Sequence, residues 1–582
     1  MKNKRFLVLA MIALLAVVFV VPIALAGWGL PELADGGVAF PAQDDGEGED
    51  EEPASNVITP TVVTAVSLEQ SEEEADEAEE ETESEPPMIT HGPMSGEIMT
   101  DTAVLWVRGN QAGTVEFQIA QDAEFAEVVL STTVGISEAV DYIGEVRVDG
   151  LEPGTDYLFQ ATLAVSDTVS APVQGFFQTA PDDATGFDFV FGSCLGGQGY
   201  CRDPETGWEI FNVMVAESPD FFVFTGDTIY GDSACTVPEN VPGAEEITRD
   251  LEGFRGRYQY HLEDAHYANF LAQTPVYASW DDHEVIDDFG GPALGEVNPQ
   301  LLADGGQAFF EYWPLQAQED GTQQIYRSIP YGDHAEFIIL DTRSYRDPNV
   351  NWDPHPRTIT PKTMLGEAQY AWLQERLANS TATWKFIVTS VPLSYPTGFP
   401  QPEVDGRDSW ANYTEKSGYE TELLSLIFFI ESQNIENVVF LTGDTHWPFA
   451  ISYDPDRNGE ANFYEFGSSP ISAITLPPVE VPDPTLNPTV MYSEGEFMGS
   501  LFNFGHVVVD DDGNLTFRIV DGAGEERYSV TIEPEGLDAL DAAVGEGEEL
   551  GEESTDNDES SGEGSSEEGE SSGEGEGSSD DG

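Results

Sequence analysis

The sequence predicts an α/β fold preceded by a small all-β domain, because the apolar residues follow two different rhythms along the chain. Between residues 88 and 180, short runs alternate apolar and polar residues with the period of half-buried strands. Between residues 186 and 530, short and continuously apolar strands alternate with helical stretches. That alternation is typical of sheets covered by helices, so we assign the larger part to the α/β (α+β) class.

The all-β part is predicted from three strand-like runs and one turn. The turn at residues 151–157 carries Pro153 and Gly154 and ends on Tyr157, which resembles the tyrosine corner of fibronectin type III sandwiches. We therefore expect an immunoglobulin-like or fibronectin-III-like β-sandwich over residues 88–180. The predicted strands lie at residues 103–107, 114–119 and 144–148.

The α/β part is predicted from buried strands of three to six residues. A helix is expected between the first two strands, at residues 208–216. After the last α/β strand, two β-like runs return near the end of the domain. The strands are expected at residues 187–191, 221–224, 276–278, 337–340, 386–388 and 438–441, with the late runs at 506–509 and 515–520.

Charge divides the chain further. The 582 residues carry a formal net charge of −89, and roughly a third of the 110 acidic residues lie in two low-complexity tracts. We expect the segment 27–87, which is Glu-rich from residue 43, and the tail 541–582 to be disordered, because neither can bury enough apolar surface to fold. Such a charge excludes a nucleic-acid-binding surface. Two explanations of the high negative charge are left open: adaptation to a high-salt habitat, and a charged surface that keeps a secreted protein soluble.

The N-terminus predicts export. Lys2, Lys4 and Arg5 precede an apolar run, and Ala24-Leu25-Ala26 fits a small-residue cleavage site. We therefore expect residues 1–26 to be a signal peptide and the protein to be secreted or held at the cell surface, with no stable membrane span after cleavage. An uncleaved anchor is the alternative, since the run is nearly long enough to span a bilayer. We expect a monomer.

Residues that can bind metal ions follow one predicted strand after another. Cys194 follows the first strand and Asp227 the second, the run 281–283 (Asp-Asp-His) follows the third, and Asp444 and His446 follow a late strand. Each motif alone indicates only a turn. Because the carboxyl ends of strands are where sites assemble in α/β sheets, four such ends together predict a metal site.

The ordered motifs resemble a known family. They are similar to those of the calcineurin-like metallophosphoesterases and, within them, of the alkaline phosphatase D (PhoD-like) family, over about residues 88–530. The resemblance implies a hydrolase of phosphoric esters with a four-layer αββα fold, in which two sheets of a β-sandwich are flanked by helices. The strings that carry it are Phe191-Gly192-Ser193-Cys194, Gly226-Asp227-Thr228-Ile229-Tyr230, Trp280-Asp281-Asp282-His283-Glu284, Leu340-Asp341-Thr342-Arg343-Ser344-Tyr345-Arg346-Asp347 and Gly443-Asp444-Thr445-His446.

The resemblance also implies a centre of two or three metal ions. Asp227 would bridge two of them, and a thiolate, a phenolate and an imidazole beside it suit Fe³⁺ better than Ca²⁺. The implied iron ligands are Cys194, Asp227, Tyr230 and His446.

Oxygen-rich ligation predicts one or two calcium ions in the second part of the centre. Asp444 and a carboxylate of the Asp281-Asp282 pair, assigned as Asp282, would hold calcium. Asp288 stands where many family members have Asn and is assigned as a further ligand. The family usually supplies a His after the strand at 386–388, but the segment 390–393 has none, which favours calcium over zinc.

Three roles have alternatives. His283 is assigned as the catalytic residue that protonates the leaving oxygen, and positioning the Asp282 carboxylate is its alternative role. Arg343 is assigned to phosphate binding, against a structural salt bridge. Cys194 is either a free metal ligand or the disulfide partner of Cys201, since three cysteines leave one thiol over.

The predicted function is hydrolysis of a small or polymeric phosphate ester, mono or diester, by a metal-activated hydroxide. A surface binding protein that kept the fold without catalysis is the alternative. A structural protein that binds calcium through its acidic tracts is a third reading.

Overall fold

The computed structural model describes residues 85–535, apart from 236–243, 316, 318–321, 349–352, 354–359, 399–407, 413–416 and 480–481. The predicted signal segment, nearly all of the predicted linker and the tail 541–582 lie outside these residues. Within the described part of the chain, no helix is both long enough and apolar enough to cross a membrane.

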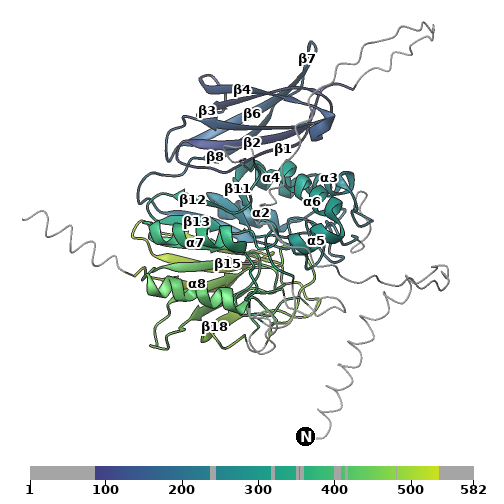
Figure 1. Ribbon diagram of the computed structural model, residues 1–582. Helices are drawn as coiled ribbons and strands as arrows, with labels where there is room; N and C mark the ends of the chain where they lie inside the picture. The colour runs from purple at the N-terminus through teal and green to yellow at the C-terminus, as the bar shows by residue number, and fades with distance from the viewer. Residues whose placement is uncertain are drawn as a thin grey trace, which may run out of the picture. The chain divides into compact units, whose positions relative to one another are not determined.

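Two large sheets form the centre of the fold (Figure 1). The first has nine strands in the order β21-β20-β19-β9-β10-β11-β1-β2-β5, and β9, β10 and β11 within it are parallel. Its strands are β1 (Ile89–Gly96), β2 (Thr102–Gly109), β5 (Ile143–Asp149), β9 (Phe187–Gly192), β10 (Phe221–Phe224), β11 (Val276–Ala278), β19 (Asn503–Val509), β20 (Leu515–Asp521) and β21 (Glu526–Ile532).

The second sheet has seven strands in the order β12-β13-β14-β15-β17-β16-β18, and its central strands β13, β14, β15 and β17 are parallel. Its strands are β12 (Arg327–Tyr331), β13 (Ala335–Ile339), β14 (Trp384–Val388), β15 (Val438–Thr442), β16 (Phe449–Tyr453), β17 (Phe463–Gly467) and β18 (Pro488–Ser493).

Apolar faces on both sides of the central strands produce four layers. Phe189, Phe337 and Phe517 lie in the core shared by the two sheets, with Phe189 and Phe337 edge to face. One group of helices packs on the outer face of the nine-stranded sheet, and α7 and α8 pack on the outer face of the other. The predicted αββα class is therefore confirmed. The helices are α2 (Ile210–Glu217), α3 (Leu251–Leu262), α4 (Ala265–Gln273), α5 (Gly291–Val297), α6 (Pro299–Tyr312), α7 (Gly366–Asn379) and α8 (Glu420–Ser432).

The N-terminal strands form a second, smaller sandwich. Its outer sheet contains β3 (Gly113–Ala120), β4 (Val128–Ile136), β6 (Asp156–Val165), β7 (Thr168–Val169) and β8 (Val173–Gln178), and a short 3₁₀ helix, η2, covers Glu138–Val140. The Tyr157 hydroxyl accepts a hydrogen bond of 3.0 Å from the backbone N–H of Glu152, as expected for the tyrosine corner.

The opposite sheet of this sandwich is shared with the larger domain. Strand β1 pairs with β2 and also, in parallel, with β11 at Gly96 and Val276. A Cβ on Gly96 would lie 2.5 Å from the Val276 carbonyl oxygen, so this junction requires glycine. The sandwich is thus continuous with the sheet that carries three of the strand ends of the predicted site.

Candidate metal centre

The predicted site residues follow strands of both large sheets. Cys194, Asp227 and the Asp281-Asp282-His283 run come after β9, β10 and β11, whereas Asp444 and His446 come after β15. Cys194, Asp227, Asp444 and His446 have left-handed backbone conformations, with φ between 51° and 64°. Non-glycine residues adopt this region rarely, and it is concentrated at functional sites, where the surrounding structure holds the strain.

The first donor group is built from the residues assigned to iron. Ligand atoms of Cys194, Asp227 and His446 all lie within 4.8 Å of one another, and the three residues are buried. The Tyr230 hydroxyl lies 3.0 Å from Asp227 Oδ2 and 3.2 Å from His446 Nε2. The disulfide joins Cys201 to Cys235, so the Cys194 thiol is free within this group.

His446 is held in the form that binds a metal ion. Its Nδ1 donates a hydrogen bond to the Ile474 carbonyl oxygen, which fixes the proton on Nδ1 and presents Nε2 as a lone pair. Burial lowers the pKa of His446 to about 4, so the ring is neutral at pH 7. A neutral imidazole oriented by a carbonyl oxygen is a typical metal ligand.

The second donor group consists of carboxylates. Asp281, Asp408 and Asp444 bring oxygen atoms within 4.8 Å of one another, and so do Asp282, Asp288 and Asp408. Burial, together with the neighbouring Asp281 and Asp408, raises the pKa of Asp444 well above its usual range. Burial likewise raises the pKa of Asp281 to about 6 and that of Asp288 to about 9. The carboxylates outnumber the two arginines that contact them, Arg343 and Arg346.

Three buried oxygen atoms in this group have no hydrogen-bond partner among the described residues: Asp281 Oδ2, Asp282 Oδ1 and Asp444 Oδ2. A buried carboxylate oxygen without a partner carries a large desolvation cost. Divalent cations with oxygen ligands offset that cost. The donor set therefore fits bound cations, with a thiol–phenol–imidazole side and a carboxylate side.

Asp227 connects the two sides. It belongs to the group with Cys194 and His446, and it also lies within 4.8 Å of donor atoms of Asp282 and His283. A carboxylate has two oxygens to share between ions, so this position is suited to bridging. The structure thus brings together all seven residues predicted as metal ligands. The sequence predicts Asp444 beside Asp282, whereas the structure places its carboxylate beside those of Asp281 and Asp408.

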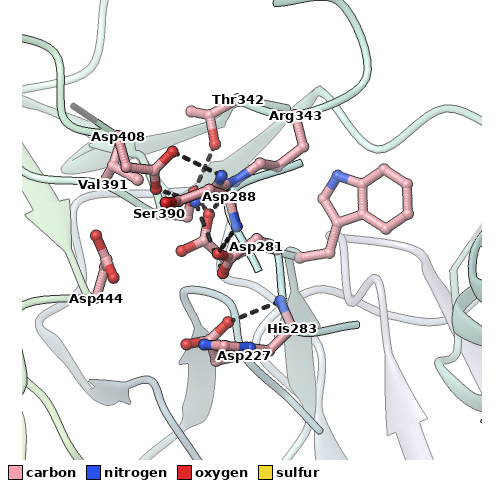
Figure 2. Close-up of polar contacts among 12 residues, drawn as sticks. Asp227, Asp281, His283, Asp288, Thr342, Arg343, Ser390, Val391, Asp408 and Asp444 are labelled. Carbon is pink, nitrogen blue, oxygen red and sulfur yellow. Dashed lines mark hydrogen bonds and ion pairs between the residues drawn. The ribbon is translucent and has the colours of Figure 1, made fainter. Parts of the chain in front are cut away.

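Arg343 is paired with carboxylates of the centre. Its side chain is fully buried, and its Nε and Nη1 donate to Asp281 Oδ1 at 2.6 Å and to Asp408 Oδ1 at 2.8 Å (Figure 2). Its other terminal nitrogen also contacts Asp408. These contacts favour the alternative role, a structural salt bridge, and phosphate binding by Arg343 stays a prediction.

His283 lies at the edge of the centre and is held from two sides. Its Nδ1 is 2.8 Å from Asp232 Oδ1, and its ring stacks on the Tyr230 ring with centroids 4.1 Å apart. Burial favours the neutral ring, but Asp232, Asp282 and Asp227 outweigh it and raise the pKa of His283 well above its usual value. Its Nε2 lies 3.9 Å from Asp287 Oδ1, so the ring has a carboxylate near each nitrogen.

Sequence reasoning missed Asp232, Asp408 and Ser390. Asp232 had a signal, since Gly231-Asp232 repeats the Gly226-Asp227 pair within the same loop. Ser390 donates to Asp281 Oδ1 at 2.7 Å and lies in the segment where a His was expected. Asp408 lies far along the loop between β14 and α8, and not at a strand end, so only tertiary structure brings it to the site.

Known proteins confirm the class that this fold and site define, the metal-dependent phosphatases. The chain belongs to the PhoD-like phosphatase family, whose model matches residues 189–515, and the model of the PhoD-like phosphatase N-terminal domain matches residues 74–181. Alkaline phosphatase D of Bacillus subtilis (strain 168) is 30% identical over 405 residues, which cover 63% of this chain and 66%, just under two thirds, of that protein.

Two solved structures share the fold. A structure of PhoD superimposes with a TM-score of 0.60 and 22% identity over 77% of this chain and 93% of that chain. A purple acid phosphatase from yellow lupin (Lupinus luteus) seeds gives a TM-score of 0.54 and 13% identity, over 78% and 76% of the two chains. The predicted family is therefore confirmed.

Proposed function

We propose that the protein is an exported phosphatase and phosphodiesterase that uses one Fe³⁺ ion and one or two Ca²⁺ ions. The observation that carries this proposal is the division of the centre into two chemically different donor groups that share Asp227. Family membership supports hydrolysis of phosphoric esters, and the donor groups support the choice of metals.

The donor types support the metal assignment. Cys194, Tyr230 and His446 supply sulfur, phenol oxygen and nitrogen, which select a transition metal rather than calcium. Asp282, Asp288 and Asp444, with Asp281 and Asp408 beside them, supply only oxygen, which calcium prefers. Asp288 in place of the Asn common in the family offers a carboxyl group on the calcium side, which a bound cation would keep ionised.

When bound, the metal ions would supply Lewis acidity for the phosphate oxygens and lower the pKa of an attacking water. The protein's own residues supply the proton transfer. His283 would hold a proton at Nε2 for the leaving oxygen while Asp232 fixes the ring through Nδ1. Arg343 would keep Asp281 and Asp408 in place, so that the carboxylates do not separate before a cation binds.

Export is supported by the disulfide between Cys201 and Cys235, because such bonds persist mainly in oxidising compartments. The basic and apolar N-terminal run supports the same location. Mass spectrometry of the mature protein from culture medium tests this part, with cleavage after Ala26 as the expected result.

The catalytic proposal is tested by reconstituting the purified protein with iron and calcium. We expect hydrolysis of p-nitrophenyl phosphate and its bis ester, bound iron and calcium by elemental analysis, and a visible phenolate-to-iron charge-transfer band. The Tyr230→Phe variant should lose the band, and Asp444→Asn should lose calcium. Asp456→Asn, which changes an exposed carboxylate outside the site, is the matched control.

The outcomes separate the alternatives. A colourless and fully metallated enzyme would contradict iron bound through Tyr230. Bound metal without hydrolysis of either ester would favour a binding protein with a metallophosphoesterase fold. Loss of bound calcium on deleting the terminal acidic tracts would favour the third reading, in which those tracts bind the ions.

A further inference from the structure

Helix α8 is apolar on both faces, which is unusual for a helix at the surface. Its sequence, Glu-Thr-Glu-Leu-Leu-Ser-Leu-Ile-Phe-Phe-Ile-Glu-Ser, has a continuous apolar centre. Leu423, Leu426 and Ile430 face the core under the seven-stranded sheet. The outer face carries the polar Thr421, Ser425 and Ser432 together with Leu424 and Phe428, so its exposed apolar area is a patch suited to an apolar partner.

The outer face carries two large exposed side chains. Phe428 is 71% exposed and Leu424 is 40% exposed, and they lie four residues apart on one side of the helix. Together with Tyr370 and Gln374 of α7, they line a shallow, mainly apolar groove between the two helices. We call this the α7–α8 groove; its other lining residues are Thr421, Ser425, Phe429 and Ser432.

The last described residue lies close to one end of this groove. The Glu535 N–H donates to Asn437 Oδ1 at 2.8 Å, and Asn437 Nδ2 donates to the Glu535 carbonyl oxygen at 3.1 Å. Asn437 follows Ser432, the final residue of α8, by five positions. The polypeptide therefore leaves the described structure next to the C-terminal end of α8, and not on the opposite side of the domain.

The sequence beyond Glu535 has a suitable apolar pattern. Residues 537–544 read Leu-Asp-Ala-Leu-Asp-Ala-Ala-Val, with Leu537, Leu540 and Val544 at the three- and four-residue spacing of one helix face. They are followed by the acidic, Gly- and Ser-rich tail, which contains no comparable apolar group. The segment is thus the one apolar stretch that follows Glu535 in the sequence.

We propose that residues 537–544 dock as an amphipathic helix in the α7–α8 groove, antiparallel to α8. Leu537, Leu540 and Val544 cover Phe428 and Leu424. The acidic tail then begins at a fixed point on the surface. This inference concerns the outer surface of α7 and α8 and does not depend on the proposed catalytic activity.

The lengths agree with this placement. Eight helical residues rise by roughly 10 Å, which matches the part of α8 between Ser432 and Leu424. In the proposed arrangement the chain would reverse its direction directly after Glu535. If extended, the nine residues 536–544 reach up to about 30 Å, so the tether does not limit access to any part of the groove.

The test uses the full-length protein with two introduced cysteines, Ser425→Cys in the groove and Ala543→Cys in the segment. Neither change removes an apolar residue of the proposed contact. We expect a short bismaleimide to join the two thiols within one molecule, seen as faster migration on denaturing gels and loss of both thiols by mass spectrometry. The native Cys194 is buried, and Cys201 and Cys235 are paired.

A matched control separates docking from simple proximity. The same cysteine pair is combined with Leu537→Asp and Val544→Asp, which keep the tether length but remove the apolar face. Docking predicts that the crosslinking rate falls at least about tenfold, because the effective concentration of the segment at the groove falls. An unchanged rate overturns the proposal. Crosslinks between two molecules also overturn it, because they show a second copy in the groove.

Discussion

Replacing Arg343 with Met gives the sharpest test of how the candidate site is held together. The guanidinium is fully buried and contacts Asp281 and Asp408, and Asp282 lies 3.7 Å away. Removing one partner of a buried ion pair leaves uncompensated charge and costs about 3–5 kcal/mol. We therefore expect Arg343→Met to lower the free energy of unfolding of the metal-free protein by about that amount.

Urea-induced unfolding, measured with and without calcium, is the assay. Calcium should restore part of the loss, because a cation beside Asp281 and Asp408 replaces the missing positive charge and binds only the folded state. Arg343→Lys should be intermediate, since an ammonium group keeps the charge but cannot hold two carboxylates in a fixed fork. Arg457→Met, on an exposed hairpin loop, is the control for loss of an arginine.

One result would refute this reasoning. If Arg343→Met left the free energy of unfolding unchanged and raised KM about tenfold or more with kcat preserved, then Arg343 would bind substrate. In that case substrate would reach Arg343 in the working enzyme, and the assignment of Arg343 to phosphate binding would be supported.

Three further predictions concern catalysis, metal binding and pH. Asp232→Asn should lower kcat by roughly 10- to 100-fold in steady-state assays and leave bound metal unchanged, because Asp232 holds His283 and the Asp287 N–H and belongs to neither donor group; loss of metal would contradict a positioning role. Cys194→Ser should lower the iron content by elemental analysis while calcium is retained; unchanged iron would exclude the thiol as a ligand. Burial raises the pKa of Glu465 from 4.5 to about 7, so the folded state keeps a proton that the unfolded state releases, and stability falls as pH rises from 4.5 to 7. Relative to Glu465→Gln, urea unfolding should show this loss as about 3 kcal/mol, and parallel pH profiles of the two proteins would contradict it.

Local sequence was sufficient to locate most strands and the site loops. The runs at 187–191 and 438–441 became β9 and β15 with shifts of one residue at their ends. A run of four to six apolar residues predicts a strand that is buried on both faces. This signal depends only on residues that are adjacent in the sequence. Cys194 and His446 each lie in the loop directly after one of these strands. Their positions could therefore be predicted, because the end of a strand fixes where the following loop begins.

The sequence did not show which strands belong to the same sheet. The sequence separates the N-terminal sandwich from the larger domain, yet β1 pairs with β11 across 180 positions, Gly96 to Val276. An edge of a small sandwich and an edge of a large sheet have the same local pattern. Whether the two edges meet is decided by long-range backbone pairing.

By itself, the sequence predicted the family, the αββα class and the candidate metal donors, because the motifs that carry them are residue types at fixed distances from strand ends. Tertiary structure alone decided how the donors divide. It brought Asp408, from far along the loop between β14 and α8, to Asp281 and Asp444, and it placed Arg343 against Asp281 and Asp408. Buried charges need partners wherever the fold places them, and no local spacing specifies which distant side chain will be there.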